Sequence, residues 1–364
     1  GASLANPLKF VRIDGQDYTV ASTAPSLARS EHRLLGLGLK TRSGGTWDLE
    51  FVASAYDQTR DLSLSATPVN GYDSGFGDGF GSTPTPGQLT DTSGTGWHNA
   101  DLRGQWRPGS RVGAHALAWG LHHDRYELAS VTWGTAAQPL ADWRVSDSGT
   151  LSTNSYGKTR TDAIYLQDEW KAAPGLTLTA GARYERWKAF DGSNYNAGNA
   201  APNPKNLVYA ERRYANVSPK AAVSWQASDA LTLRASVGKA VRYPTVAEMF
   251  QTFNGPGGIR FNDPNLKPEQ VWSSEWVLEH RRASSSLRVS LFTEDKSDAL
   301  ISQTDVTVTP TISSIQNVDK VRTRGLELVG QASEPGVRGL ERNGSVTWTD
   351  SKITADRRNP GLEG

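Results

Sequence analysis

Two adjacent histidines, His122 and His123, are the side chains of this sequence best suited to hold a transition metal. Asp124 follows them directly, and His115 precedes them on the same segment. Imidazole nitrogens combined with a carboxylate form a common ligand set for divalent transition metals. Neighbouring residues of a β-strand point to opposite faces, however, and this segment has strand character. The alternative interpretation, a solvated strand end without a metal, is therefore favoured.

Aromatic and arginine side chains form a second set with chemical potential. Aromatic rings stack on planar ligands, and guanidinium groups hydrogen-bond and neutralise anions. The set lies on or beside segments rich in glycine and polar residues, and its members are Tyr72, Phe76, Phe80, Trp97, Arg125, Trp133, Trp143, Tyr195 and Arg242. Together they predict a binding surface for a large planar anion. For any one of them, packing within a loop or anchoring at an interface is the simpler interpretation.

No motif indicates enzyme chemistry or a cofactor. GFGDGFG (75–81) resembles a phosphate-binding loop only in its glycines, because no Lys-Ser/Thr pair follows it. Asp73, Asp78 and Asp91 do not have the spacing of a calcium loop. The Gly-x-Ser-x-Gly and His-Glu-x-x-His motifs are absent, and the sequence contains no cysteine. We therefore predict a protein that is not an enzyme.

The elements that must position these residues are β-strands, because apolar and polar residues alternate along most of the chain. In LTLTAGARY (176–184), leucine, alanine and tyrosine side chains share one face, while threonine and arginine share the other. The same period of two recurs in WDLEFVASA (47–55), LTLRASVG (231–238) and SLRVSLFTE (286–294). Each segment approaches the roughly 9 to 11 residues of a tilted strand that crosses a bilayer.

The alternation predicts about twelve strands joined by connections of alternating length. The strands are expected near 30–40, 46–57, 97–106, 111–125, 161–171, 176–187, 217–226, 231–239, 272–281, 286–296, 320–331 and 344–353. TRSGG, RPGS, KAAPG, ASD and RASSS make tight turns, whereas 58–96, 126–160, 188–216, 240–271 and 297–319 make long loops. Within one long loop, PTVAEMFQ (244–251) is compatible with a short helical turn. Tight turns at one end and long loops at the other are typical of outer-membrane barrels.

Composition is compatible with an all-β transmembrane antiparallel barrel, although composition alone would favour an aromatic-rich soluble β-protein. Apolar residues make up 37% of the chain, and no apolar run reaches the roughly 20 residues of a membrane-spanning helix. Twelve Trp and eleven Tyr suit a protein with aromatic belts at two membrane interfaces. Arg183, Arg234 and Glu50 would be buried unpaired in a soluble sandwich, but they face a wet lumen in a wide barrel. The net charge of +1 and the scattered basic residues do not indicate nucleic-acid binding.

Five blocks of the sequence resemble the barrel of TonB-dependent outer-membrane receptors. They are YLQDEWKAAPGLTLTAGARYERW (165–187), NVSPKAAVSWQASDALTLRASVGKAVRYPTVAEMF (216–250), DPNLKPEQVWSSEWVLE (263–279), LFTEDKSDALI (291–301) and NVDKVRTRGLELVG (317–330). In this resemblance, Asn265 to Glu269 form the turn at the base of a long extracellular loop. Glu269, Glu275 and Glu279 are then carboxylates of the barrel wall, not an acid/base pair.

The resemblance implies an architecture and a function. Such receptors have a 22-stranded barrel filled by a plug domain in the outer membrane of a Gram-negative bacterium. Their loops capture a scarce large ligand, usually a ferric siderophore, and the TonB complex acts on the plug to drive uptake. The implied partners are thus the TonB complex, a ferric siderophore or similar ligand, and outer-membrane lipid. Cobalamin, other metal chelates and oligosaccharides remain open as ligands.

The sequence departs from the family pattern in its extent. It shows no plug, no TonB box and no final strand ending in an aromatic residue, and its strand count falls about ten short. An open sheet would leave two unpaired edges in lipid, where each unsatisfied backbone group costs several kcal/mol. We expect residues 1–364 to be a barrel section, with the plug and the last strands outside this sequence. A closed twelve-stranded barrel, a passive porin and a secreted β-rich enzyme are the alternatives.

Overall fold

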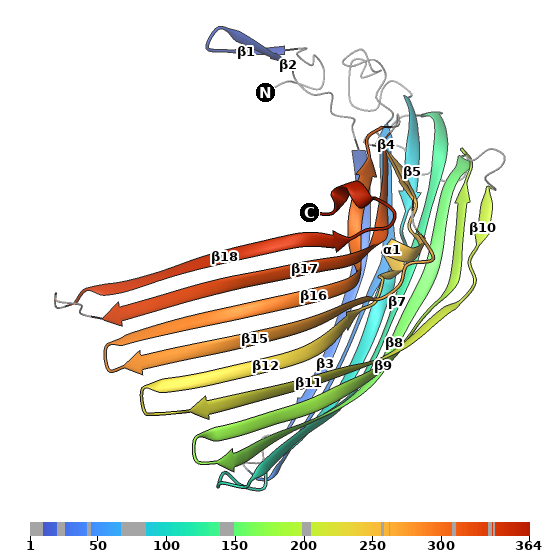
Figure 1. Ribbon diagram of the computed structural model, residues 1–364. Helices are drawn as coiled ribbons and strands as arrows, with labels where there is room; N and C mark the ends of the chain where they lie inside the picture. Colours follow the sequence, from blue (N-terminus) through green and yellow to red (C-terminus); the bar gives the residue numbers. More distant parts are fainter. Residues whose placement is uncertain are drawn as a thin grey trace.

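The computed structural model describes residues 10–19, 26–41, 45–66, 85–138, 149–198, 205–255, 258–261, 263–307, 311–333, 337 and 339–364. Long strands form one continuous curved sheet (Figure 1). They are β3 (Ser26–Lys40), β4 (Trp47–Ala66), β6 (Gly96–Trp106), β7 (His115–Gln138), β8 (Thr150–Ala173), β9 (Leu176–Asn196), β11 (Arg212–Gln226), β12 (Leu231–Arg242), β15 (Glu269–Arg282), β16 (Ser285–Asp305), β17 (Ile312–Ser333) and β18 (Glu341–Ala355). Each pairs antiparallel with the next long strand along the chain.

Shorter elements border this sheet. They are β1 (Phe10–Ile13), β2 (Gln16–Thr19), β5 (Thr85–Asp91), β10 (Asn206–Val208), β13 (Phe253–Gly255), β14 (Gly258–Phe261), the helix α1 (Val246–Phe250) and a 3-10 turn at Pro360–Leu362. β1 and β2 pair only with each other in the described part of the chain. No helix among the described residues is long and apolar enough to cross a membrane.

The twelve predicted strands are confirmed, and the short helical turn at 244–251 is observed as α1. Short turns join the strand pairs as expected, except that β7 begins at His115 and not near 111, so the turn predicted as RPGS extends over 107–114. Gly175, between β8 and β9, has a φ of +73°, a conformation that glycine adopts without steric cost. The strands extend further into the predicted loops than the alternation indicated. β7 continues to Gln138, β8 begins at Thr150, and β5 pairs with β4 and β7 inside the segment predicted as a loop over 58–96.

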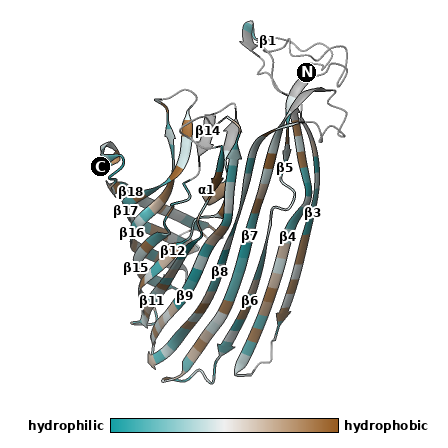
Figure 2. Ribbon diagram, turned by 90° about the vertical axis from the view of Figure 1, so that its right-hand side faces the viewer, coloured by the Kyte–Doolittle hydropathy of each residue, from teal (hydrophilic) through white to brown (hydrophobic). Residues whose placement is uncertain are grey.

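The outer face of the sheet carries exposed apolar side chains in register. Leu121, Ile164, Tyr184 and Val217 oppose one another across β7, β8, β9 and β11, and each is between 42% and 54% exposed. Figure 2 shows hydrophobic residues interspersed with hydrophilic ones along the strands. An apolar surface that runs across several strands is unfavourable in water. It is the surface that a barrel presents to lipid.

The outer face becomes charged just beyond that apolar row. Arg125, Arg160, Lys188 and Arg213 oppose one another on the same four strands, four residues further from the short turns on β7. Arg125, for example, lies over the ring of Phe190 at 5.6 Å from its centroid. The change from apolar to basic residues marks the end of the membrane-spanning part of these strands.

The inner face carries charges that are paired. Arg183 donates to Glu185 at 2.8 Å, Arg234 lies 3.7 Å from Glu279, and Lys40 lies 3.7 Å from Glu50. Arg183, Arg234 and Glu50 thus lie on the inner face, as the alternation predicts, and each has an ion-pair partner there. Two further carboxylates of the wall are also paired: Glu269 lies 3.5 Å from Lys296, and Glu275 lies 3.5 Å from Arg288.

The described sheet is open. β3 pairs only with β4, and β18 pairs only with β17, among the described residues. β3 and β18 therefore do not close a twelve-stranded barrel with each other. Figure 1 shows the strands arranged as a deep curved wall, with α1 against its concave side.

Candidate ligand-binding surface on the inner face

The connection between β12 and β15 is folded onto the inner face by α1. Thr245 caps the helix by accepting a hydrogen bond from the Glu248 amide at 3.2 Å, and the Glu248 carboxylate accepts one from the Thr245 amide at 2.8 Å. This reciprocal pair satisfies two amides that a helix start otherwise leaves without partners. Arg242 donates to Glu248 at 2.5 Å and fixes the entry of the chain into the helix.

Phe250 anchors α1 in a notch made by two glycines. A Cβ at Gly157 would lie 2.1 Å from the Phe250 ring, and one at Gly192 would lie 2.2 Å from it. Phe250 is 2% exposed. Asn194 donates to the Phe250 carbonyl at 2.5 Å, and Ser155 accepts from the Thr252 amide at 3.0 Å. The notch therefore holds both the ring and the backbone of the segment.

A buried aromatic stack continues from this anchor. The ring of Tyr243 lies parallel to Trp187, with centroids 5.5 Å apart and 6° between the planes. The Asn216 amide donates to the Tyr243 hydroxyl at 3.0 Å. Burial raises the pKa of Tyr243 to about 12. The phenol thus stays neutral at every physiological pH.

A second aromatic group, Tyr56, Trp97 and Tyr126, lies on the same inner face and is called the aromatic patch below. The rings of Tyr56 and Trp97 stack with centroids 6.2 Å apart and 22° between the planes. Trp97 opposes Tyr126 in the strand register, and Tyr126 opposes Thr159, which shares its face with Gly157. The patch therefore faces the same space as α1. It offers ring faces to a planar ligand.

Histidine and aspartate lie next to the aromatic patch. His122 is hydrogen-bonded to Asp101 at 3.0 Å and to Asp124 at 2.9 Å, so both ring nitrogens are engaged. His123 lies on the outer face, 2.8 Å from Asp162. The two histidines point to opposite faces, as predicted for neighbours in a strand. Within the described ranges, no group of three or more His, Cys, Asp or Glu side chains is arranged to hold a metal ion.

The structure does not gather the predicted ligand residues into one cluster. Trp97 belongs to the aromatic patch, and Arg242 is engaged with Glu248. Trp133 opposes Leu89 and Leu151 near the far end of β7. Arg125 and Tyr195 lie on the outer face: Arg125 opposes Arg160, and Tyr195 opposes Asn154, which shares its face with Tyr156 and Lys158. Tyr72, Phe76, Phe80 and Trp143 lie outside the described residues.

Several inner-face aromatics lie in strands and are not among the predicted ligand residues, most of which lie in predicted loops. Tyr56 follows Asp48 and Glu50 at even spacing on β4, so its position on the inner face was readable from the alternation. Tyr126 follows His122 on β7 in the same way. Trp187 follows Arg183 and Glu185 on β9 in the same way. Its stacking with Tyr243 carried no such signal, because only the folding of α1 onto β9 brings the two rings together.

A family model for "TonB dependent receptor-like, beta-barrel" matches residues 4–364 of this chain. The chain belongs to the TonB-dependent receptor family. Barrels of this family lie in the outer membrane of Gram-negative bacteria and act as receptors and transporters. The match covers nearly the whole sequence, so the twelve long strands described above are the family's barrel strands.

Solved structures share this fold at low sequence identity. The ferric citrate transporter FecA in its unliganded form matches with a TM-score of 0.60 and 16% identity over 90% of this chain and 43% of that chain. The copper transporter OprC gives 0.62 and 16% over 90% and 48%. The ferric yersiniabactin uptake receptor FyuA from Yersinia pestis gives 0.56 and 14% over 92% and 45%. This chain thus spans a little under half the length of those proteins.

Proposed function

We propose that this chain is part of an outer-membrane receptor that captures a large scarce solute and takes it up actively, with a ferric siderophore as the first candidate ligand. The family supports receptor-mediated uptake. Among the proteins of similar fold, FecA is named for ferric citrate and FyuA for ferric yersiniabactin. OprC is named for copper, so a copper chelate is the second candidate.

The aromatic patch is the observation that carries this proposal. Tyr56, Trp97 and Tyr126 lie on the inner face, and Tyr126 lies five residues beyond Leu121, which belongs to the lipid-facing row on the other face of β7. A ligand that descends between the loops would therefore meet ring faces before it reaches the membrane-spanning part of the wall. Stacking on such rings suits the planar chelating groups of a siderophore.

Active uptake requires partners in addition to the barrel wall. We propose that a plug domain fills the space bounded by the inner face, and that the TonB complex acts on this plug. The paired charges of the inner face support the proposal, because a wall lined with Lys40–Glu50 and Arg183–Glu185 pairs suits a polar neighbour and not lipid. The charge-lined hollow beside Tyr165 has a volume of about 580 Å³.

Transport assays in cells that express the complete protein test the proposal. Labelled iron would be supplied as a panel of ferric chelates, with and without a protonophore that removes the inner-membrane proton gradient. We expect saturable uptake of one chelate that stops with the protonophore. Uptake that is linear in concentration and insensitive to the protonophore would overturn the proposal in favour of a passive porin.

A pair of neighbouring substitutions assigns the ligand surface. Trp97→Ala removes a ring of the aromatic patch, and His98→Ala removes a ring on the outer face, where His98 stacks on His123. We expect Trp97→Ala to weaken binding of the transported chelate at least tenfold and His98→Ala to leave it within twofold. Equal binding by both variants would place the ligand elsewhere.

A further inference from the structure

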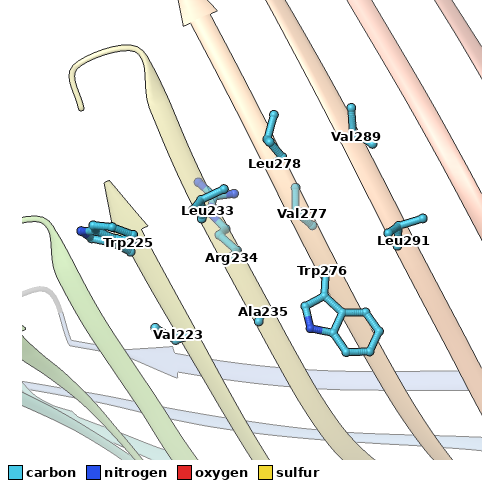
Figure 3. A pocket seen from close by; sticks show the side chains of 10 residues that line it. All are labelled: Val223, Trp225, Leu233, Arg234, Ala235, Trp276, Val277, Leu278, Val289 and Leu291. Carbon is cyan, nitrogen blue, oxygen red and sulfur yellow. The ribbon is translucent and has the colours of Figure 1, made fainter. Parts of the chain in front are cut away.

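An apolar depression of about 480 Å³ lies on the outer face over β11, β12, β15 and β16 (Figure 3). It is bordered by Val223, Trp225, Leu233, Ala235, Trp276, Leu278, Val289 and Leu291, with Arg234 and Val277 of the opposite face beneath them. The indoles of Trp225 and Trp276 are 49% and 53% exposed. In a membrane, lipid covers such a surface. A specific lipid site additionally requires features that favour one kind of lipid over the others.

Side-chain size explains the depression. Ala235 lies between Trp276 on β15 and Val223 on β11 in the strand register, and Leu233 lies between Leu278 and Trp225. The methyl group of Ala235 leaves a gap beside the Trp276 indole that a larger side chain would fill. The gap over Ala235, with Leu233 and the two indoles around it, is called the furrow below.

Basic residues lie on the same face as the furrow, at the short-turn end of β15. Its outer-face column continues from Leu278 to His280 and Arg282, and His280 lies between Leu231 and Leu287 in the register. Arg282 is exposed, and it has no ion-pair partner among the described residues. Arg281 lies on the opposite face and donates to Glu279. Arg282 is therefore the cation on the lipid side of the turn.

The distance from the furrow to Arg282 along the membrane normal matches the hydrocarbon thickness of one membrane leaflet. Trp276 and Arg282 are six residues apart on β15, a rise of about 20 Å along the strand. A strand tilt of about 40° reduces this to about 15 Å along the membrane normal. The hydrocarbon core of a bilayer is about 30 Å thick, so one leaflet contributes about 15 Å.

We propose that the furrow binds an anionic phospholipid of the leaflet on the short-turn side. One acyl chain lies against Ala235 between Trp225 and Trp276, and the phosphate accepts hydrogen bonds from the Arg282 guanidinium, with His280 beside it. The apolar side chains of the furrow explain the affinity for the acyl chain. The Arg282 cation, which has no ion-pair partner among the described residues, explains the preference for an anionic headgroup. This site is separate from the aromatic patch on the inner face.

Native mass spectrometry of the complete protein in mild detergent tests the site. The protein is titrated with phosphatidylglycerol and with phosphatidylcholine of the same chain length. We expect phosphatidylglycerol to bind at least fivefold more tightly, Arg282→Gln to abolish this preference, and Arg281→Gln, its neighbour on the inner face, to preserve it. Equal affinity for the two lipids, or an unchanged preference in Arg282→Gln, would overturn the proposal.

A third variant separates the furrow from the cation. Ala235→Phe fills the gap beside Trp276 and should weaken binding of both lipids at least threefold without changing their ratio. If Ala235→Phe instead alters only the monomer–dimer ratio, the furrow is a contact between copies of the chain and the lipid site is wrong. Thermal unfolding of each variant, followed by circular dichroism, confirms that all compared proteins are folded.

Discussion

Adjacent residues of β12 have opposite surroundings, which makes this strand a direct test of the two faces. Ala235 lies on the outer face between Val223 and Trp276, whereas Ser236 lies on the inner face opposite Glu275. An arginine near the middle of the lipid-facing band costs about 2 to 4 kcal/mol. The same side chain on the inner face meets water and the Glu275 carboxylate.

We therefore expect Ala235→Arg to lower the free energy of unfolding in lipid vesicles by about 2 to 4 kcal/mol. Ser236→Arg is the matched control and should change it by less than about 1 kcal/mol. Urea titration of vesicle-inserted protein, followed by tryptophan fluorescence, measures both. Similar destabilisation by the two variants would mean that the inner and outer faces are assigned incorrectly.

The chain after β18 is held by the ion pairs Arg357–Asp319 and Arg358–Asp263, and the Arg357–Asp319 pair is the shorter of the two. The Arg357 amide and guanidinium donate three hydrogen bonds of 2.9 Å to the Asp319 carboxylate. These donors hold the pKa of Asp319 well below its usual range. The ionised Asp319 carboxylate therefore stabilises the docked segment fully above the ordinary aspartate pKa of about 4. This stabilisation is lost as the pH falls below that value and the carboxylate is protonated.

Spin labelling measures this pH dependence. The sequence contains no cysteine, and a side chain added at Gly361 would have no atom within 4 Å, so Gly361→Cys gives a single undisturbed label. We expect the label to become more mobile below about pH 4. Asp319→Asn should make it mobile at every pH. A label whose mobility does not change with pH in the unsubstituted background would contradict the assignment.

At the scale of elements, the position of α1 depends on the absence of two side chains. Gly157 and Gly192 leave the space that Phe250 occupies. Gly157→Ala places a methyl group in the space that the Phe250 ring occupies. Overpacking of this kind costs about 1 to 3 kcal/mol of stability. Gly134→Ala on β7 is the control, because its nearest neighbour would be 3.9 Å away.

We expect Gly157→Ala to release α1 from the wall while the strands remain folded. Hydrogen–deuterium exchange of residues 245–252 should become at least tenfold faster in this variant and stay unchanged in Gly134→Ala. If exchange over this segment does not respond to Gly157→Ala, then Phe250 is not the anchor of the connection.

In this protein, the sequence predicts the membrane-spanning part of the strands but neither their ends nor the docking of α1. The strand cores were predictable because lipid on one side and water on the other impose a strict alternation, as in Leu176 to Tyr184. Beyond the lipid, the outer face of a strand no longer requires apolar side chains. Lys158, Thr159 and Arg160 therefore show no alternation of apolar and polar residues, and the loop predicted over 126–160 includes the observed start of β8 at Thr150. The docking of α1 was not predictable, because it depends on contacts between distant strands.

At the scale of the whole molecule, the two free edges are the main energetic problem. β3 and β18 leave backbone groups without partners on one side in the described part of the chain. In lipid, each such group costs several kcal/mol. We propose that further strands of the same barrel cover both edges.

The intact mass of the protein extracted from outer membranes tests this proposal. We expect a mass well above the 39.4 kDa of this sequence. Amides at the edges of β3 and β18 should then be protected from hydrogen exchange as strongly as those of β8. A mass equal to this sequence, with freely exchanging edges, would mean that the wall closes in another way.

In the proposed receptor, the strands that rise past the lipid present a folded surface outside the membrane. β7 has 24 residues, more than twice the roughly 9 to 11 that cross a bilayer. Its upper part therefore extends beyond the lipid together with the neighbouring strands. Arg125, Arg160, Lys188 and Arg213 stand there in one line across β7, β8, β9 and β11, although they are far apart in sequence. An antibody or phage fibre that binds this line recognises a conformational epitope. Peptides from any one strand would not reproduce it, so immunisation with the folded barrel is required to target it.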